Sequence, residues 1–358
     1  LRNVWVIPKQ NFTGAHFACV DEKTEALTPS GWKAQDLLSD GDVIAAFSQE
    51  TQNLEWQAAT FHRYSDAPIW KWEKRDLSMA LTPNHRCLVL TKKRKNSANR
   101  RDVVRAADLT GRHSILTSAT FDEADAGSSA SIGTLWASLV GWYITEGHKC
   151  KQTKPAVEIY QSQSANPRNV ETIRYLLTNV GATWKEYSRT RLWTHKGKSR
   201  PHTLITFRVT GDTATRLMQL APNKTLTPRL VWLPKNDAIA LFTAIVSGDG
   251  SRRRDGRQAF IQKSLECAEW AQILGMRLGF RAIISKRLGS TYIVYYTTGG
   301  WLTMRGTNGV EPTHTVSKGR VWCPSVQSSF WLARRDGKPF ITGNTFPEKL
   351  VEPIIKLA

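Results

Sequence analysis

The sequence lacks the features of a disulfide-stabilised or membrane-spanning protein. It contains five cysteines, an odd number, and no two of them show the CxxC spacing. This pattern argues against a disulfide framework and against a zinc knuckle, and it fits the reducing cytoplasm of a prokaryotic or phage-infected cell. A signal peptide and a long apolar run are also missing, so nothing in the sequence indicates a membrane.

Acidic residues are scarce relative to basic ones. Asp and Glu number 30 against 50 Lys and Arg, which gives a net charge of +20 at pH 7. An excess of this size favours a polyanionic partner, most often nucleic acid. The 358 residues, of which 41% are hydrophobic, suffice for two or three domains with cores of their own. Because the chain begins at Leu1 rather than Met, we expect a fragment of a longer protein.

Two residues near opposite ends of the chain mark the limits of an insert. When residues 19–344 are removed, residues 14–18 (GAHFA) and 345–350 (TFPEKL) read as one continuous segment. Taken alone, Asn344 after a Gly is typical of a turn, and an isolated Cys19 is typical of a small buried side chain. Together they place a nucleophile at the first position of the insert and an Asn at its last, with the hydroxyl of Thr345 directly after it.

These residues suit a chain of acyl transfers. Cys19 would attack the Ala18 carbonyl carbon and convert the amide into a thioester, because a thiol is the most nucleophilic of the neutral side chains. Thr345 would then take the acyl group as an ester. Asn344 would cyclise through its side-chain amide and release the insert, after which an O-to-N shift joins Ala18 to Thr345.

The motif Thr82-Pro83-Asn84-His85 supplies a candidate acid for the first step. A Thr and a His at this spacing can both face one peptide bond from the end of a strand. We expect His85 to protonate the leaving amide nitrogen, and Thr82 or Asn84 to hold the carbonyl. The alternative is an ordinary turn histidine.

These motifs closely resemble the splicing blocks of Hint-type inteins. Cys19 with residues 27–32 (LTPSGW) resembles the first block and residues 81–85 (LTPNH) the block with Thr and His, while residues 320–326 (RVWCPSV) and 340–345 (FITGNT) resemble the last two. The resemblance implies an all-β Hint horseshoe formed by both ends of the insert. It also implies excision of residues 19–344 and ligation of the flanks, without a cofactor.

The chain departs from the intein pattern at the residue before the last Asn. Gly343 stands where the family has His, so another group must assist the cyclisation of Asn344. His314, Arg334 and ordered water are the candidates.

A second departure is Cys323, which stands where the family has Asp. We expect this thiol to coordinate the step from thioester to ester. A related class of inteins uses that Cys as its first nucleophile, with a Trp at the position that Cys87 occupies here. Because Cys19 is present and the Trp is not, we favour the standard route.

A different pattern occurs twice in the middle of the chain. Residues 139–147 (LVGWYITEG) and 242–250 (FTAIVSGDG) each end in an acid and a Gly. Each is followed by a strand-like run ending in Gln and then by an amphipathic helix ending in Gly. Four features in the same order indicate a duplicated α/β unit, against the alternative of two amphipathic helices with incidental acids. The segments resemble the LAGLIDADG motifs of homing endonucleases.

The resemblance implies αββαββα-type repeats in a monomer that cuts double-stranded DNA at the intein-less host gene. Small residues would let the two helices pack closely and bring Glu146 and Asp249 together, where they would hold Mg²⁺ between two scissile phosphates. Gln161 and Gln262 would sit near the metal. Lys263 or Lys286 would polarise phosphate or water.

The strands after each motif would bind the DNA backbone through basic side chains, although any one of them is also consistent with a solvated surface charge. The candidates are Arg189, Arg191, Lys198, Arg208, Arg252, Arg253, Arg254, Arg257 and Arg287.

The composition along the chain predicts five segments. Residues 1–18 and 345–358 together resemble the region of amino-group DNA methyltransferases (cytosine-N4 or adenine-N6) that precedes the cofactor-binding strand, so we expect them to be host sequence, or exteins, in cis. Between them we expect splicing parts at 19–120 and 313–344 and an endonuclease at 121–312, with repeats at about 131–232 and 236–310.

Three alternatives stay open from the residues alone. The first is an intein whose endonuclease is inactive. The second is a DNA-binding, non-splicing autoprotease of the Hint class, which does not need Thr345. The third is a DNA-binding regulator, for which the pairing of Cys19 with Asn344 is a coincidence.

Overall fold

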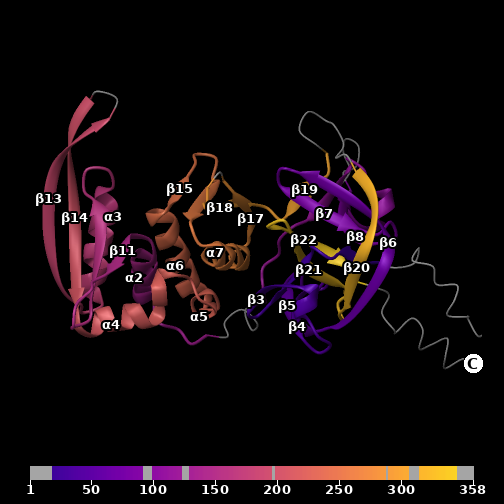
Figure 1. Cartoon of the computed structure of the whole chain (residues 1–358), viewed down its shortest axis with the longest axis horizontal. Coiled ribbons are helices and arrows are strands. Elements are labelled where there is room, and N and C mark those ends of the chain that lie inside the picture. The colour runs from indigo at the N-terminus through magenta and orange to yellow at the C-terminus, as the bar shows by residue number, and fades with distance from the viewer. Residues whose placement is uncertain are drawn as a thin grey trace, which may run out of the picture. The chain divides into compact units, whose positions relative to one another are not determined.

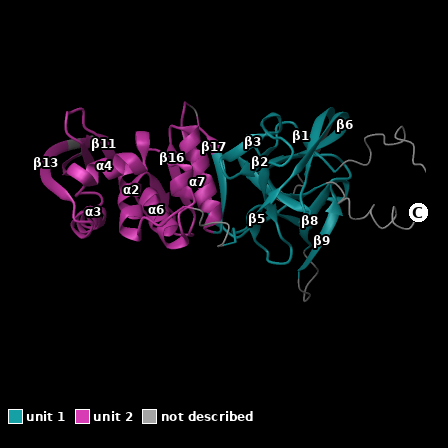
Figure 2. Ribbon diagram, turned by 90° about the horizontal axis from the view of Figure 1, so that it is seen from below, with its two compact units in different colours: residues 1–125, 279–284, 297–358 teal, residues 126–278, 285–296 magenta. Residues whose placement is uncertain are grey.

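A computed structural model describes residues 18–91, 99–122, 129–195, 198–287, 289–305 and 314–344. The chain forms two compact units (Figure 2). Unit 1 takes in the described residues of 1–125, 279–284 and 297–358, and unit 2 those of 126–278 and 285–296. The flanking segments 1–17 and 345–358, with Thr345 and the resemblance to a methyltransferase, lie outside the described residues. Within the described part of the chain, no helix is long and apolar enough to cross a membrane.

Unit 1 is built from short strands that come from both ends of the chain (Figure 1). The close spacing of Gly, Pro and Asn between apolar runs favours such strands. They are β1 (Val20–Asp21), β2 (Glu25–Thr28), β3 (Gly31–Ala34), β4 (Val43–Phe47), β5 (Leu54–Ala58), β6 (Thr60–Lys74), β7 (Leu77–Leu81), β8 (Arg86–Thr91), β9 (Arg100–Arg105), β10 (His113–Leu116), β19 (Trp301–Thr303), β20 (His314–Ser325), β21 (Phe330–Arg335) and β22 (Lys338–Gly343).

Three sheets combine strands from the N-terminal and the C-terminal parts of the chain. One is a closed barrel in the order β1-β20-β6-β7, a second runs β19-β10-β8-β9, and a third runs β3-β2-β21-β4-β5 with β22 paired to β21. In the barrel, Val20 lies opposite Trp322 and Asp21 opposite Val321 in antiparallel register. The first strand after Cys19 is therefore paired with a strand near the other end of the chain.

The core of unit 1 is aromatic where the late strands enter it. Trp322 and Trp331 are fully buried with ring centroids 5.3 Å apart, and Phe340 is buried in the same cluster. A buried ion pair joins the two ends of the chain as well, since the Arg335 guanidinium lies 3.0 Å from the Asp21 carboxylate. Apolar packing and a paired charge thus hold β1, β20, β21 and β22 in one core.

Residues 134–298, which belong to unit 2 except for 279–284 and 297–298, contain two similar runs of elements. Each begins with an apolar helix, continues with two strands, and then has a second helix and two longer strands. The first run is α2 (Thr134–Glu146), β11 (Gly147–Lys149), β12 (Ala156–Ser162), α3 (Pro167–Asn179), β13 (Thr183–His195), β14 (Lys198–Thr210) and α4 (Gly211–Leu220), and the second, after α5 (Pro228–Val231), is α6 (Lys235–Gly248), β15 (Gly250–Arg252), β16 (Gln258–Gln262), α7 (Leu265–Arg277), β17 (Phe280–Lys286) and β18 (Tyr292–Thr298).

Helices α2 and α6 pack directly against each other through small residues. A Cβ atom added to Gly141 would lie 2.6 Å from the Ala244 Cβ, and one added to Gly248 would lie 2.2 Å from the Thr145 Oγ1. Contacts this short leave no room for a larger side chain at either glycine. The carboxylate of Asp237, in the first turn of α6, accepts a hydrogen bond from the Ile132 N–H just before α2. The two helices are therefore fixed both along their contact and at their N-terminal ends.

Each run of unit 2 has its own four-stranded antiparallel sheet. The orders are β11-β12-β14-β13 and β15-β16-β18-β17. Along β14 the residues Ile205, Phe207 and Val209 are buried and alternate with more exposed ones. This period of two gives each sheet one face in the core and one face towards solvent.

Candidate functional site

The two ends of the predicted insert meet around one buried histidine. Cys19 precedes β1 and Asn344 follows β22, and both side chains are fully buried. His85 ends the turn between β7 and β8, where its Nε2 lies 2.5 Å from the Thr342 Oγ1. On the other side, the backbone of Ala18 and Cys19 lies beside the imidazole. One side chain thus contacts both the segment that enters the insert and the segment that leaves it.

Thr82 holds the peptide bond between Ala18 and Cys19. The Cys19 N–H donates to the Thr82 Oγ1 at 3.0 Å, and the Thr82 N–H donates to the Cys19 carbonyl at 3.0 Å. The sequence suggested that Thr82 or Asn84 would hold the Ala18 carbonyl. The structure instead puts the Thr82 hydroxyl at the amide nitrogen, because the backbone pairing that extends β1 along β7 fixes it there. Asn84 is half-buried in the same turn, and no hydrogen bond of its side chain is seen among the described residues.

The Cys19 and Cys323 thiols lie side by side in the barrel. Cys19 precedes β1 by one residue and Cys323 lies in β20, so the register of these strands sets the two residues opposite each other. The Cys19 Sγ donates to the Cys323 Sγ at 3.1 Å, and both residues are fully buried. This hydrogen bond, together with burial, raises the pKa of Cys19 well above its usual range. Cys19 is therefore a neutral thiol at pH 7 that must lose its proton as it attacks.

Tyr64 of β6 is a neighbour of this thiol pair that sequence reasoning missed. Burial raises the pKa of its phenol to about 12, and Cys323 and Cys19 act in the same direction. A Tyr in a long strand carries no local signal of this kind. Only the pairing of β6 with β20, in which Tyr64 lies opposite Val321, reveals it.

The environment of His85 keeps its ring neutral. Burial lowers its pKa to about 3, and the backbone of Ala18 and Cys19 offsets this only in part. Its Nδ1 is buried without a hydrogen-bond partner in the described part of the chain, although that backbone is close. A neutral imidazole at this place is able to accept a proton at one nitrogen while it gives one up at the other.

Three hydrogen bonds hold Asn344 and the peptide bond that joins it to Gly343. Its N–H donates to the Ser329 carbonyl at 3.0 Å, its Nδ2 donates to the Val326 carbonyl at 2.8 Å, and the Trp331 indole N–H donates to the Gly343 carbonyl at 3.1 Å. Sequence reasoning did not single out Trp331 or Val326. The signal was weak because an indole in a buried strand ordinarily reads as core.

Of the candidates named to replace the missing histidine, the structure places only Arg334, and it has other partners. The Arg334 guanidinium is bound to the Glu25 carboxylate at 2.7 Å through two nitrogens and lies over the Trp32 ring. The positive charge of Arg334 is therefore paired with Glu25. The side chain of His314 falls outside the described residues. Cys87, buried behind the same turn, has its pKa raised to about 12 by burial.

A second candidate site lies in unit 2, at the C-terminal ends of α2 and α6. Glu146 is the last residue of α2, and Asp249 directly follows α6. The Gln161 Nε2 donates to the Glu146 Oε1 at 3.2 Å, and the Gln262 Nε2 donates to the Asp249 Oδ2 at 3.3 Å. The two halves therefore present the same pair, an acid held by a Gln from the neighbouring strand.

The electrostatics of this site fit a bound cation. Burial raises the pKa of Glu146 and the nearby charge of Asp249 raises it further, while burial raises the pKa of Asp249. The charge of Lys224 lowers both values, so this lysine lies near both acids. Lys224 has a φ of +57°, and Asn223 before it a φ of +56°, an uncommon backbone conformation in the turn after α4. The sequence offered no motif at Lys224.

Oxygen ligands of this kind suit Mg²⁺, which binds one or two carboxylates and otherwise keeps water. Among the described residues no group of three or more His, Cys, Asp or Glu side chains gathers at one point. The site is therefore a two-carboxylate site. Lys263 and Lys286, the lysines suggested from sequence, are both exposed, and neither is among the described groups that shift the pKa of the two acids.

Some of the basic candidates for DNA binding lie on the solvent face of the first sheet. In the register of β13 and β14, Arg189 lies opposite Leu204, Arg191 opposite His202 and Lys185 opposite Arg208, which puts all of them on the face away from the buried Phe207. Arg189 and Arg191 are exposed.

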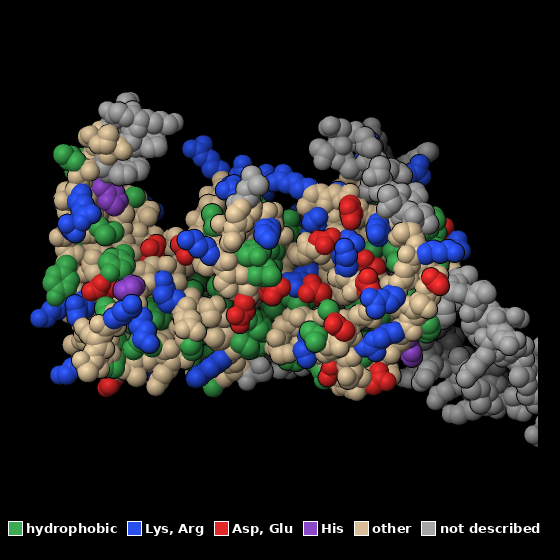
Figure 3. Space-filling model, viewed as in Figure 1, with side chains coloured by type: hydrophobic (Ala, Val, Ile, Leu, Met, Phe, Trp, Pro, Cys, Tyr) green, Lys and Arg blue, Asp and Glu red, His purple; other side chains and the backbone are tan. Residues whose placement is uncertain are grey.

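Arg208, by contrast, is half-buried beside Glu158 and Gln152. The remaining candidates flank the second sheet. Arg252, Arg253, Arg254, Arg257 and Arg287 are exposed, Arg257 forms an ion pair with Asp255, and the side chain of Lys198 lies outside the described residues. Figure 3 shows Lys and Arg side chains gathered around the end of β15.

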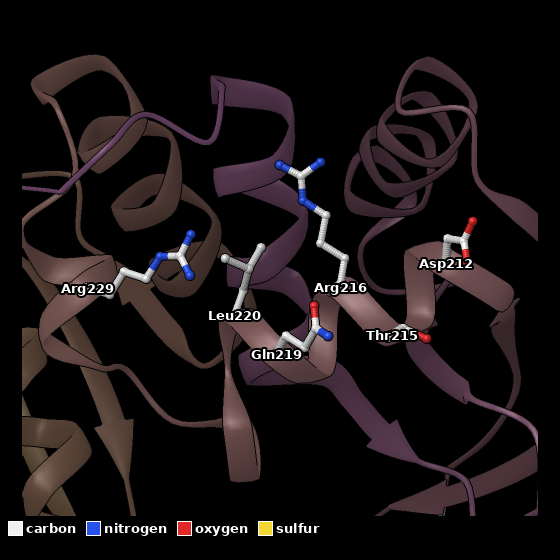
Figure 4. Close-up of a pocket in the computed structure, with 6 residues that line it drawn as sticks. All are labelled: Asp212, Thr215, Arg216, Gln219, Leu220 and Arg229. Carbon is white, nitrogen blue, oxygen red and sulfur yellow. The ribbon is translucent and has the colours of Figure 1, made fainter.

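A surface pocket of about 370 Å³ lies between α4 and α5 (Figure 4). Arg216 and Arg229 line it from the two helices, and the Arg216 guanidinium lies 4.0 Å from the centroid of the Trp136 ring. None of the acids or glutamines of the second site lines this pocket.

Comparison with known proteins finds no matching family model and no matching curated sequence. Among solved structures, variants of the homing endonuclease I-DmoI match at 14% identity with a TM-score of 0.34, over 46% of this chain and 88% of theirs. The homing endonuclease I-WcaI bound to its DNA recognition sequence matches at 13% identity with a TM-score of 0.33, over 46% and 76%. A splice-inactive variant of the AceL NrdHF class 3 split intein matches at 7% identity with a TM-score of 0.34, over 92% and 99%. Likenesses this low establish no shared function.

Proposed function

We propose that the chain is a self-splicing intein that excises residues 19–344 and joins Ala18 to Thr345, and that it carries a DNA endonuclease in unit 2. The observation that supports splicing most directly is that buried His85 contacts both the backbone of Ala18 and Cys19 and the side chain of Thr342, two residues before Asn344. Residues so far apart in the chain have no structural need to share a histidine.

The first step is the attack of the Cys19 Sγ on the Ala18 carbonyl carbon. The C–S bond forms and the C–N bond to Cys19 breaks, while the thiol proton must reach the amide nitrogen. Thr82 supports this step because its hydroxyl already lies 3.0 Å from that nitrogen. Neutral His85, beside the same backbone, is placed to take up one proton and give up another.

The later steps move the acyl group and cut the second junction. Thr345 takes the acyl group from the thioester as an ester, and Cys323, 3.1 Å from the Cys19 sulfur, is placed to assist this transfer. Asn344 then closes to a succinimide through its Nδ2 and breaks its bond to Thr345. The ester finally rearranges to an amide without help.

For unit 2 we propose double-strand cleavage of the intein-less host gene with Mg²⁺. Glu146 and Asp249 would hold the metal, which activates water and stabilises the leaving oxygen when bound. Gln161 and Gln262 orient the two carboxylates, and the charge of Lys224, which lowers the pKa of both acids, would favour a phosphate at this site. We further propose host exteins in cis from a methyltransferase, and a monomer, since one chain supplies both acids.

Mass spectrometry of the expressed chain tests splicing. Splicing predicts a free polypeptide of residues 19–344 and a ligated flank of residues 1–18 and 345–358, and Asn344→Ala should prevent ligation. A non-splicing autoprotease predicts cleavage after Ala18 without ligation, also in Thr345→Ala. A chain that stays intact through long incubation in reductant contradicts both.

A separate assay tests the endonuclease. The purified protein should cut DNA that carries the uninterrupted host gene in the presence of Mg²⁺, and Asp249→Asn should abolish the cut. Splicing that persists while no cut occurs with any divalent metal would establish the alternative, an intein with an inactive endonuclease.

A further inference from the structure

The residue before Asn344 lies in a slot that no side chain fits. A Cβ added to Gly343 would lie 2.7 Å from the Arg86 carbonyl oxygen and 2.8 Å from the Arg86 Cβ. Both atoms belong to or adjoin the backbone of β8 immediately after His85, so they cannot move aside without displacing the site. The absence of His at position 343 is therefore built into the fold.

Two hydrogen bonds fix the Gly343 carbonyl and the side chain of Asn344. The indole N–H of Trp331 fixes the Gly343 carbonyl, and the Val326 carbonyl receives one hydrogen of the Asn344 Nδ2. Trp331 is fully buried and packs on Trp322, so its N–H has one orientation. The other polar atom of the Asn344 side chain, Oδ1, is buried without a partner among the described residues.

Cyclisation needs the Asn344 Nδ2 to attack the carbonyl carbon of the same residue. The new C–N bond forms, the bond to Thr345 breaks, Nδ2 loses a proton and the leaving amine gains one. The reaction is intramolecular, so its rate depends strongly on how well the nucleophile and the carbonyl are oriented before attack. An acceptor at an Nδ2 hydrogen also favours loss of that proton.

We propose that Trp331 is the positioning residue for Asn344 cyclisation, and that with the Val326 carbonyl it takes the place of an imidazole at position 343. This inference rests on the proposed splicing function. Trp331 holds the peptide on the N-terminal side of Asn344, and Val326 holds its side chain, so both the backbone and the nucleophile are restrained before attack.

The test measures the two junctions separately. Release of residues 345–358 is followed in a Cys19→Ala background, where only Asn344 cyclisation remains, and thioester formation is followed by dithiothreitol cleavage after Ala18 in an Asn344→Ala background. Trp331→Phe keeps the ring and removes the N–H. It should slow release of the C-terminal segment about tenfold, the effect of about 1.4 kcal/mol, and change thioester formation less than twofold.

Trp322→Phe is the matched control. Its indole N–H donates to the Asp21 carbonyl at 3.1 Å, in the same core but on the side of the other junction. Because Phe keeps an aromatic ring against Trp331, this variant should change C-terminal release less than twofold. If both Phe variants slow C-terminal release equally, or if neither does, Trp331 has no positioning role.

Gly343→His and Gly343→Ala test the closed slot. Both should slow C-terminal release, and Gly343→His should not restore a faster reaction. A faster Gly343→His variant would overturn the inference. If thioester formation occurs but the Cys19→Ala chain never releases residues 345–358, the inference fails and the first step of splicing stands. If neither reaction occurs, the proposed splicing function fails with it.

Discussion

At the scale of residues, the short distance between the Cys19 and Cys323 sulfurs gives the sharpest prediction. Residues opposite each other on antiparallel strands have Cα atoms about 4.5–5.5 Å apart, a separation that a disulfide spans. The two sulfurs already lie 3.1 Å apart. Diamide, which accepts two hydrogens, should therefore join them and remove the nucleophile.

This oxidation should stop thioester formation and be reversed by dithiothreitol, as followed by intact mass and by N-terminal cleavage. In Cys323→Ser the same treatment should leave Cys19 active. Equal loss of activity in Cys323→Ser would show that another thiol or another oxidation is responsible.

The lowered pKa of His85 predicts how the free energy of unfolding of unit 1 depends on pH. Its pKa is about 3 in the folded chain and near 6.5 when exposed, so the unfolded chain binds a proton that the folded chain does not. Its contribution is complete above pH 6.5 and is lost as the pH falls towards 3, by up to about 5 kcal/mol. Thermal unfolding of Asn344→Ala, which cannot splice, should show this loss between pH 6.5 and pH 4. A second substitution, His85→Gln, should make the curve flatter, and an unchanged slope would refute the assignment.

At the scale of elements, the α2–α6 contact should tolerate no added volume. Gly141→Val places methyl groups where the Ala244 Cβ already lies 2.6 Å from an added Cβ, so the helices must separate. Overpacking of this kind costs about 1–3 kcal/mol. Urea unfolding of unit 2 should show this loss, while Thr243→Ala on the exposed face of α6 should change stability little. Since the acids sit at the ends of these helices, Gly141→Val should also weaken Mg²⁺-dependent cleavage.

The same helices connect stability with the proposed metal binding. Burial disfavours the ionised form of Asp249, so removing the charge should help folding when no metal is bound. Asp249→Asn should raise the melting temperature of unit 2 in EDTA and abolish any further rise on addition of Mg²⁺. A lower melting temperature in EDTA would mean that the hydrogen bond from Gln262 and the charge of Lys224 outweigh the cost of burying the carboxylate.

For the whole molecule, the two units predict separable activities. The splicing residues lie in unit 1 and the two acids with their glutamines in unit 2. Glu146→Gln and Asp249→Asn should therefore abolish DNA cleavage and leave splicing intact, and Cys19→Ala should do the reverse. If unit 2 binds DNA as proposed, binding should also weaken steeply with salt, because exposed Arg residues such as Arg189 and Arg191 are the proposed phosphate contacts. Binding that is insensitive to salt would contradict this basic surface.

The sequence by itself determined which residues we assign to the proposed chemistry. Cys19, His85 and Asn344 are recognisable because each occupies a fixed place in a local motif, and the acid-Gly repeats identify Glu146 and Asp249 in the same way. Local spacing also predicted strands at both ends of the chain and helices in the middle, because hydrophobic period and turn residues are local properties.

Only the tertiary structure decided what surrounds those residues. The contacts of Cys19 with Cys323 and of Trp331 with Gly343, and the effect of the Lys224 charge on the acid pair, join positions distant in sequence. Strand register and helix packing set them. The same reason explains the errors in detail, such as the Thr82 hydroxyl at the amide nitrogen rather than at the carbonyl. The slot at Gly343 is the clearest case: the missing His is visible in the sequence, but the Arg86 backbone that excludes it is visible only in the fold.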